Sequence, residues 1–196
     1  MKRVKSHFQN REPLLEGILQ SLRFRRVEKL ITPKSSVLDL GCGYYGSFLN
    51  KLSGKISSGW GYDVSVSRKI FSKNIRLKTI STREISKLPS NHFDFVTMLA
   101  VIEHLKNPEF FISAAYKALK SSGKIILTTP SPKSKTILEI LAFRLGLVSP
   151  LEISDHKKYY NSKNLKRLLI KSGFENNKIR LQEFELGFNI LAEATK

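Results

Sequence analysis

The sequence predicts an α/β fold, in which a parallel sheet carries helices on both faces. Short apolar runs typical of strands alternate with stretches of helical spacing between residues 36 and 171. A glycine-rich loop, residues 41–46, connects the first apolar run to a helix-like stretch. Two more strand-like runs within residues 178–194 are expected to form a hairpin. The 196 residues suffice for one sizeable core, so we expect a single domain over residues 1–196.

The two kinds of pattern give the expected elements in order. Strands are expected at residues 36–40, about 59–62, 75–80, 93–99, 124–129, 178–186 and 188–194. Helices are expected at residues 47–52, 64–72, 107–119 and 162–171. Asn107 is a good helix cap, because its side chain can accept a hydrogen bond from the first turn, and Pro108 suits that turn. Gly173 is expected to close the last helix.

Two segments lie outside this alternation. Residues 1–34 form an N-terminal helical lead-in, since apolar residues recur at helical spacing from Leu14 to Ile31. We expect one or two helices packed beside the sheet there, with a substrate lid as the alternative. Residues 133–155 are densely apolar, so a helix there would be apolar on more than one face. We expect a helical insertion on the substrate side, with an oligomer contact and a membrane contact as alternatives.

The glycine loop indicates a nucleotide site. Glycines let the backbone turn sharply and approach a ligand closely, and the helix that follows points its positive end at that ligand. A second acid, Asp63, ends the next strand at about the 20-residue distance expected for a residue that binds ribose hydroxyls. A tight turn without a ligand is the simpler alternative, but strand, spacing and second acid together favour the nucleotide site.

Asp39 distinguishes between the two nucleotides that use this geometry. It lies two residues before the first loop glycine, at the end of the strand. Its carboxylate would repel the pyrophosphate of a nicotinamide dinucleotide. By contrast, the ammonium group of S-adenosylmethionine is attracted by a nearby acid or by the water around it. S-adenosylmethionine is therefore favoured over a nicotinamide dinucleotide.

The residues around this loop resemble a known family. Residues 37–43, Val-Leu-Asp-Leu-Gly-Cys-Gly, resemble motif I of class I S-adenosylmethionine-dependent methyltransferases. The resemblance continues in order to the C-terminus. Further matching segments are residues 88–89, 93–96, 101–105, 119–124, 128–130, 156–160, 165–170, 172–174 and 186–189. Within the family the chain resembles the small-molecule and glycan-pathway branch, which has Glu-His after strand four, here Glu103-His104.

The resemblance implies a Rossmann-like fold: a seven-stranded, mostly parallel sheet with helices on both faces and an antiparallel last strand. It also implies S-adenosyl-L-methionine as cofactor. The loop backbone would hold the methionine part, Asp63 the ribose, and Val64 would flank the adenine. After strand three, where related enzymes often have an aspartate, this chain has none, and Thr82, Arg83 or Glu84 would contact the adenine amine. The cofactor-binding residues expected are Asp39, Gly41, Cys42, Gly43, Asp63, Val64, Thr82 and Ala100.

A general base is needed only if the methyl acceptor starts protonated, as a hydroxyl does. His104 lies at the carboxyl end of the fourth strand, where open α/β sheets bind ligands, and it is one candidate. His156 is the second candidate. Each histidine has a simpler alternative role, which is to order its loop by hydrogen bonding. The four histidines and the cysteine show no metal-ligand spacing, so no metal is expected.

Composition limits the location and the partners. Cys42 is the single cysteine, which fits a reducing compartment, and we expect a packed loop residue rather than a nucleophile. No apolar run is long enough for a spanning helix, and the basic N-terminus lacks an apolar signal core, so we expect a cytoplasmic protein.

The formal net charge is +18. Such a charge suggests a partner that is a nucleic acid, an anionic membrane surface or an acidic substrate, with a simply solvated lysine-rich surface as the alternative. The oligomeric state is not predicted.

The leading functional hypothesis, which rests on the family resemblance, is methyl transfer to oxygen of a small-molecule acceptor: a glycan, a lipid-linked sugar or a quinone-like precursor. An RNA-modifying or RNA-binding protein is the alternative, prompted by the charge. Nucleic-acid amino-methylating enzymes usually carry Asn/Asp-Pro-Pro-aromatic after strand four, whereas this chain has Leu-Ala-Val-Ile at residues 99–102. A catalytically silent interaction module of the same fold and a nicotinamide oxidoreductase are more distant alternatives.

Overall fold

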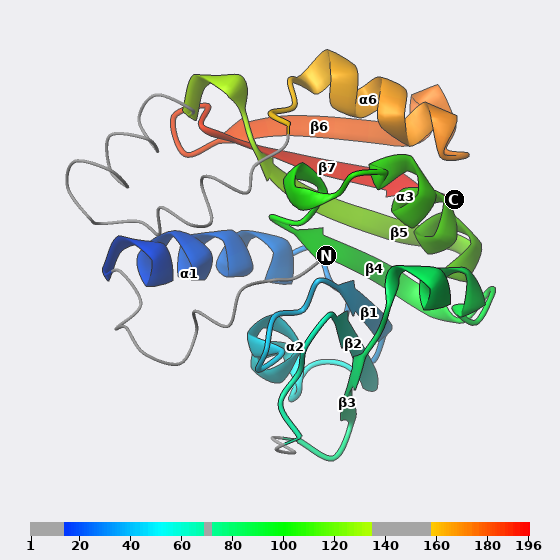
Figure 1. The fold of residues 1–196 in the computed structure, drawn as a ribbon. Coiled ribbons are helices and arrows are strands. Elements are labelled where there is room, and N and C mark those ends of the chain that lie inside the picture. Colours follow the sequence, from blue (N-terminus) through cyan, green and yellow to red (C-terminus); the bar gives the residue numbers. More distant parts are fainter. Residues whose placement is uncertain (1–13, 69–71, 135–157) are drawn as a thin grey trace.

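The computed structural model describes residues 14–68, 72–134 and 158–196. In this part of the chain, seven strands form one sheet in the order β3-β2-β1-β4-β5-β7-β6 (Figure 1). The strands are β1 (Ser36–Leu40), β2 (Ser58–Asp63), β3 (Ile75–Thr79), β4 (Phe93–Leu99), β5 (Leu119–Pro130), β6 (Ile179–Phe184) and β7 (Asn189–Thr195). The α-helices are α1 (Leu14–Glu28), α2 (Ser47–Leu52), α3 (Pro108–Ala118) and α6 (Ser162–Lys171). The short 3₁₀ helices are η2 (Thr82–Lys87), η3 (Ile102–His104), η4 (Pro132–Ser134) and η5 (Asn176–Lys178).

The pairing confirms the expected sheet. Strand β1 pairs in parallel with β2 on one side and β4 on the other, and β3 and β5 extend the parallel part. Strand β7 runs antiparallel to both of its neighbours, β5 and β6. The C-terminal hairpin therefore supplies the antiparallel last strand that the family resemblance implied.

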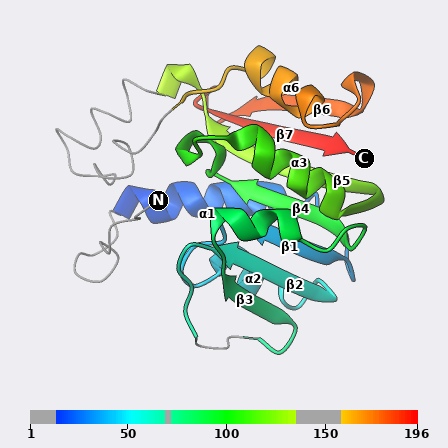
Figure 2. The same cartoon turned by 45° about the vertical axis from the view of Figure 1, so that its right-hand side comes forward.

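Helices cover both faces of the sheet, because strand side chains alternate between two separate cores. Leu38 of β1 belongs to the core that also holds Ile112 of α3 and Leu169 of α6. Its neighbour Val37 belongs to the other core, with Phe48 of α2. Figure 2 shows α3 and α6 on one side of the sheet, and α1 crosses the other side. The apolar pattern from Leu14 onward therefore forms a helix packed beside the sheet.

Local signals set the helix ends as expected. Asn107 caps α3: its side-chain oxygen accepts a hydrogen bond from the Phe110 backbone N–H at 3.3 Å. Gly173 follows α6 with φ of +114°, a conformation that favours glycine, and its N–H donates to the Ile170 carbonyl.

The structure corrects two expected elements. A helix was expected over residues 64–72, but residues 64–68 are irregular, since the Ser67 N–H donates at 2.7 Å to the Tyr44 carbonyl in the glycine loop. Strand β5 begins at Leu119 rather than residue 124, because the chain pairs with β4 on both sides of a register shift. The expected insertion at 133–155 lies outside the described residues from 135 onward, and so does His156.

The parallel strands end at a common edge of the sheet, and the loops that follow them meet there. The glycine loop follows β1, Asp63 ends β2, η2 follows β3 and η3 follows β4. Open α/β sheets bind ligands at this carboxyl edge, next to the point where the strand order reverses, here between β1 and β4. Among the described residues, no helix is long and apolar enough to cross a membrane.

Candidate active site

The glycine loop has a backbone conformation that depends on its glycines. Gly41, Gly43 and Gly46 have φ values of +80°, +73° and +59°, all in the left-handed region. The Gly41 N–H donates to the Tyr62 carbonyl at 2.7 Å, which ties the end of β1 to the end of β2. A Cβ on Gly41 would lie 2.4 Å from Cγ2 of Val101, so the loop also needs a glycine there for space.

Gly43 differs from Gly41 because its Cβ position faces open space, with no heavy atom within 4 Å. Its N–H donates at 2.9 Å to Oδ2 of Asp63. The other carboxylate oxygen, Oδ1, accepts from the Val64 N–H at 2.7 Å. Asp63 is only 6% exposed, and these two bonds fix its orientation at the end of β2. Each carboxylate oxygen can accept further hydrogen bonds, so Asp63 can still bind a pair of ligand hydroxyls.

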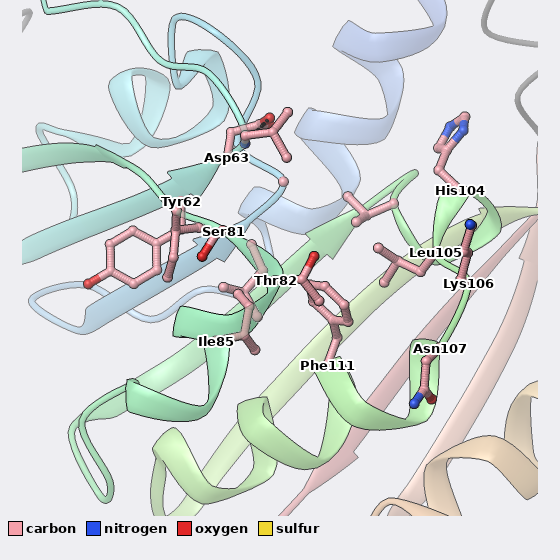
Figure 3. Close-up of a pocket in the computed structure, with 15 residues that line it drawn as sticks. Tyr62, Asp63, Ser81, Thr82, Ile85, His104, Leu105, Lys106, Asn107 and Phe111 are labelled. Carbon is pink, nitrogen blue, oxygen red and sulfur yellow. Dashed lines mark hydrogen bonds between the residues drawn. The ribbon is translucent and has the colours of Figure 1, made fainter. Parts of the chain in front are cut away.

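A cavity of about 260 Å³ lies beside Asp63 and the start of the glycine loop. It is largely apolar, with a few polar groups at its margins, as small-molecule sites usually are. The apolar side chains are Leu40, Ile80, Ile85, Val101, Leu105, Phe111 and Val64, the residue expected to flank the adenine. The polar ones include Asp63, Ser81, Thr82, His104, Lys106 and Asn107. Figure 3 shows Tyr62, Ser81 and Thr82 on one side of the residues that line the cavity, and His104 and Lys106 on the other side.

Asp39 does not line this cavity. Its side chain is 2% exposed, and Oδ1 accepts a 2.6 Å hydrogen bond from the Thr97 hydroxyl on the neighbouring strand β4. Burial raises the pKa of Asp39 from 3.8 to about 7; the Thr97 hydrogen bond opposes this rise, and the charge of Asp63 adds to it. The expected attraction between Asp39 and a cofactor ammonium stays a prediction, and a carboxyl with a pKa of about 7 would be only partly ionised at neutral pH.

The turn after β3 distinguishes between Thr82, Arg83 and Glu84, the three residues predicted to contact the adenine amine. Glu84 accepts hydrogen bonds from the backbone N–H and the hydroxyl of Ser81, at 2.9 and 2.8 Å, and so caps η2. These bonds hold the pKa of Glu84 below its usual value. Thr82 lines the cavity, whereas Arg83 and Glu84 do not. The geometry therefore favours Thr82 and adds Ser81, which was not among the predicted residues.

The segment after β4 is held in an unusual conformation. Ala100 has φ of +54°, and its N–H donates at 2.9 Å to the Thr128 carbonyl on β5. A non-glycine residue in this region is strained, and such strain concentrates at functional sites. Ala100 itself does not line the cavity, but the next residue, Val101, does, and η3 then brings His104 to the cavity.

Cys42 lies within the loop with 7% of its surface exposed, and its thiol donates to the Gly43 carbonyl at 3.4 Å. Its sulfur also lies 2.9 Å from the position of a Cβ on Gly61. These contacts agree with the expected packed loop residue. Among the described residues, no three histidine, cysteine or acidic side chains lie close enough to hold a metal ion.

Comparison with known proteins identifies the family. A family model described as a methyltransferase domain matches residues 10–179, which is most of the chain. The chain belongs to this methyltransferase family. A ubiquinone biosynthesis O-methyltransferase from Dechloromonas aromatica is 29% identical to it over 142 residues, covering 67% of this chain and 60% of that protein. A ubiquinone biosynthesis O-methyltransferase from Thiobacillus denitrificans is 24% identical, covering 86% of this chain and 76% of that protein.

Solved methyltransferase structures share the fold. An S-adenosylmethionine-dependent methyltransferase from Archaeoglobus fulgidus superposes with a TM-score of 0.69 at 21% identity, covering 91% of this chain and 94% of that chain. Phosphoethanolamine N-methyltransferase 2 from Haemonchus contortus, solved with S-adenosyl-L-methionine, gives 0.61 at 18% identity, covering 87% of this chain and 39% of that one. The cofactor of the methyltransferase family to which the chain belongs is S-adenosyl-L-methionine.

The residues present fit this cofactor. Gly41 lines the cavity, whereas Cys42 and Gly43 do not, and the open space at Gly43 leaves bare loop backbone next to it in the chain. Asp63 lies beside it with a fixed carboxylate, and the apolar side chains of Ile85, Leu105 and Phe111 line the cavity in which a planar base can be enclosed. Asp63 would therefore hold the ribose, and Thr82 or Ser81 would lie nearest the base.

Two glycine substitutions are expected to separate folding from cofactor binding. Gly41→Ala should lower the free energy of unfolding by about 2–4 kcal/mol, because a left-handed alanine is strained and its Cβ overlaps Val101. Gly43→Ala should cost only about 1–2 kcal/mol, because its Cβ enters open space. Urea unfolding measures both values. Calorimetry measures cofactor affinity. Gly43→Ala should bind S-adenosylmethionine about tenfold more weakly than the wild type, because the alanine side chain occupies space that the cofactor needs. Unchanged affinity would place the cofactor away from Gly43.

Proposed function

We propose that this methyltransferase transfers the methyl group of S-adenosyl-L-methionine to a hydroxyl oxygen of a small aromatic acceptor, such as a phenolic precursor of a quinone. The curated relatives named above are ubiquinone biosynthesis O-methyltransferases, which supports oxygen as the methylated atom and a small molecule as the acceptor. The chain spans 60% of the length of the Dechloromonas protein and 35% of a rat mitochondrial relative. The acceptor of this chain is therefore a proposal and is not transferred from those relatives. The glycan and lipid-linked acceptors suggested by the family resemblance remain secondary proposals.

The observation that carries the proposal is the placement of the polar groups around one apolar cavity. Asp63 lies on the β2 side, where it can fix the nucleoside, and His104 lies on the β4 side (Figure 3). A cofactor held by Asp63 and the glycine loop would leave the His104 side for the acceptor. The apolar lining between them suits an aromatic ring and excludes water.

The cofactor supplies a methyl group that its positively charged sulfur has already activated. The protein then has to align acceptor, methyl group and sulfur, and to keep water out. A hydroxyl acceptor must also lose its proton, and our proposal assigns this proton to His104, because His104 lines the cavity. His156 remains the second candidate from the sequence.

A histidine pair tests this assignment. His104→Gln is expected to lower the rate of labelled methyl transfer to a catechol by about 100-fold, because the proton acceptor is lost. His92→Gln is the matched control, since His92 is exposed at the start of β4, at the opposite end of the strand, where it packs against Trp60. S-adenosylmethionine affinity should stay the same in both variants. Equal rates for the wild type and His104→Gln would remove His104 from the proposal.

The acceptor is tested with unmodified protein and methyl-labelled cofactor. Catechols and phenols, with and without an apolar chain, are compared with nucleotide sugars and with RNA. Label on the aromatic compounds supports the proposal. Label on sugars or RNA alone, from protein that binds the cofactor, would overturn the aromatic acceptor and retain the methyltransferase.

A further inference from the structure

Helix α6 carries a row of cations on its solvent face. Its buried residues are Leu165 and Leu169, both 0% exposed, which pack against the sheet. The helix has no acidic residue in its ten positions. Its cations are Lys163, Lys166, Arg167 and Lys171. We call these four residues, together with the exposed Ile170, the α6 basic face.

The cations of the α6 basic face have no acidic partners in the part of the chain that the structure describes. The ion pairs found there join other residues, such as Lys178 with Glu175 and Lys124 with Glu193. Lys163, Arg167 and Lys171 are spaced at i, i+4 and i+8, so they lie on the same side of the helix and repel one another. Nothing in the helix compensates for this repulsion, whereas an anionic partner would relieve it.

The α6 basic face lies away from the cofactor cavity. Helix α6 packs against β6 and β7, and β6 is the last strand at one edge of the sheet. The cavity is lined by segments that follow β1, β2, β3 and β4, in the other half of the sheet. Figures 1 and 2 both place α6 beyond β7, at the far side from β3. A partner on α6 would therefore leave the cavity open.

Ile170 indicates which anionic partner fits. It is 42% exposed and lies one helical turn from Arg167, within the row of cations. A nucleic-acid backbone gains nothing from an exposed isoleucine, and α6 presents no aromatic side chain on which bases could stack. An anionic bilayer attracts the cations, and its interfacial region also accepts an apolar side chain. We propose that the α6 basic face docks this protein onto an anionic lipid surface.

The test compares two triple variants of equal charge. Lys163→Gln/Arg167→Gln/Lys171→Gln removes three cations from α6, and Arg25→Gln/Lys29→Gln/Lys73→Gln removes two lysines and one arginine that are exposed elsewhere. Each is sedimented with vesicles of phosphatidylglycerol and phosphatidylcholine, and with vesicles of phosphatidylcholine alone. Wild type and control should bind the anionic vesicles within about threefold of each other, while the α6 variant binds at least about tenfold more weakly. Circular dichroism verifies that each variant is folded.

A single variant separates lipid from nucleic acid. Ile170→Ser should weaken binding to the anionic vesicles by about threefold and leave binding to duplex RNA unchanged. Equal loss in both triple variants would mean that overall charge, rather than α6, is responsible, and would overturn the proposal. Failure of wild type to bind the vesicles, or α6-dependent binding to RNA alone, would overturn it as well. None of these measurements involves the methyl donor, so they stand apart from the proposed reaction.

Discussion

Asp63→Ala is expected to lower the affinity for S-adenosylmethionine by at least about 100-fold, because a carboxylate that accepts bonds from ligand hydroxyls contributes roughly 1.5–3 kcal/mol for each one. The substitution also removes the hydrogen bonds to the N–H groups of Gly43 and Val64, so the loop itself loses its fixed position. Isothermal calorimetry measures the affinity, and urea unfolding shows how much of the loss arises from reduced stability.

Glu175→Ala is the matched control for this experiment. It also removes one carboxylate, but the Glu175 side chain is 63% exposed and forms an ion pair with Lys178 across η5, and Glu175 does not line the cavity. Its affinity for the cofactor should equal that of the wild type. If Asp63→Ala binds as well as Glu175→Ala, the ribose does not lie at the end of β2.

The second large effect concerns stability and pH. Asp39 has a folded-state pKa of about 7, raised above its ordinary value of 3.8, so the native state holds a proton that the unfolded chain has released. The free energy of unfolding should therefore fall as pH rises from about 4 to about 7, by up to about 4 kcal/mol from this group alone. Asp39→Asn cannot ionise and should remove this part of the pH dependence.

The measurement is urea unfolding of the wild type and Asp39→Asn at several pH values. At pH 4 the two proteins should be similar, because Asp39 is then protonated in the folded protein and only partly ionised in the unfolded chain. At pH 8 the asparagine variant should be more stable by about 2–4 kcal/mol. Asp94→Asn provides a contrast: burial raises the pKa of Asp94, but hydrogen bonds from Lys120 and Ser36 outweigh it and lower the pKa overall, so its loss should destabilise the protein at neutral pH. Parallel pH profiles for the wild type and Asp39→Asn would show that Asp39 is not buried as described.

Strands and helices with a clear period were predictable from the sequence. The bounds of β1 and β4 agree with the apolar runs, and α6 has the bounds that its helical spacing and Gly173 predicted. Residues 64–68 were mistaken for a helix because their contact is with a distant segment, the Tyr44 carbonyl, which no local pattern reveals. The early start of β5 likewise depends on pairing with β4.

The candidate site was predictable where a motif specifies the backbone. The glycine loop and Asp63 lie together as their spacing indicated, since both terminate neighbouring parallel strands. The contribution of Leu105 and Phe111 to the cavity wall was not predicted. The sequence pattern of an apolar residue in a loop or helix does not distinguish a side chain that faces a ligand from one that faces the core. The burial of Asp39 was also not predicted, because it results from the pairing of β1 with β4 and not from the glycine-loop motif.

A calorimetric titration of the purified wild-type chain with S-adenosylmethionine, its demethylated product and a nicotinamide dinucleotide tests the cofactor site directly. We expect saturable binding of the first two compounds at one site per chain and no binding of the third. Folded protein that gives no heat with either adenosyl compound, or that binds the nicotinamide dinucleotide instead, would contradict it.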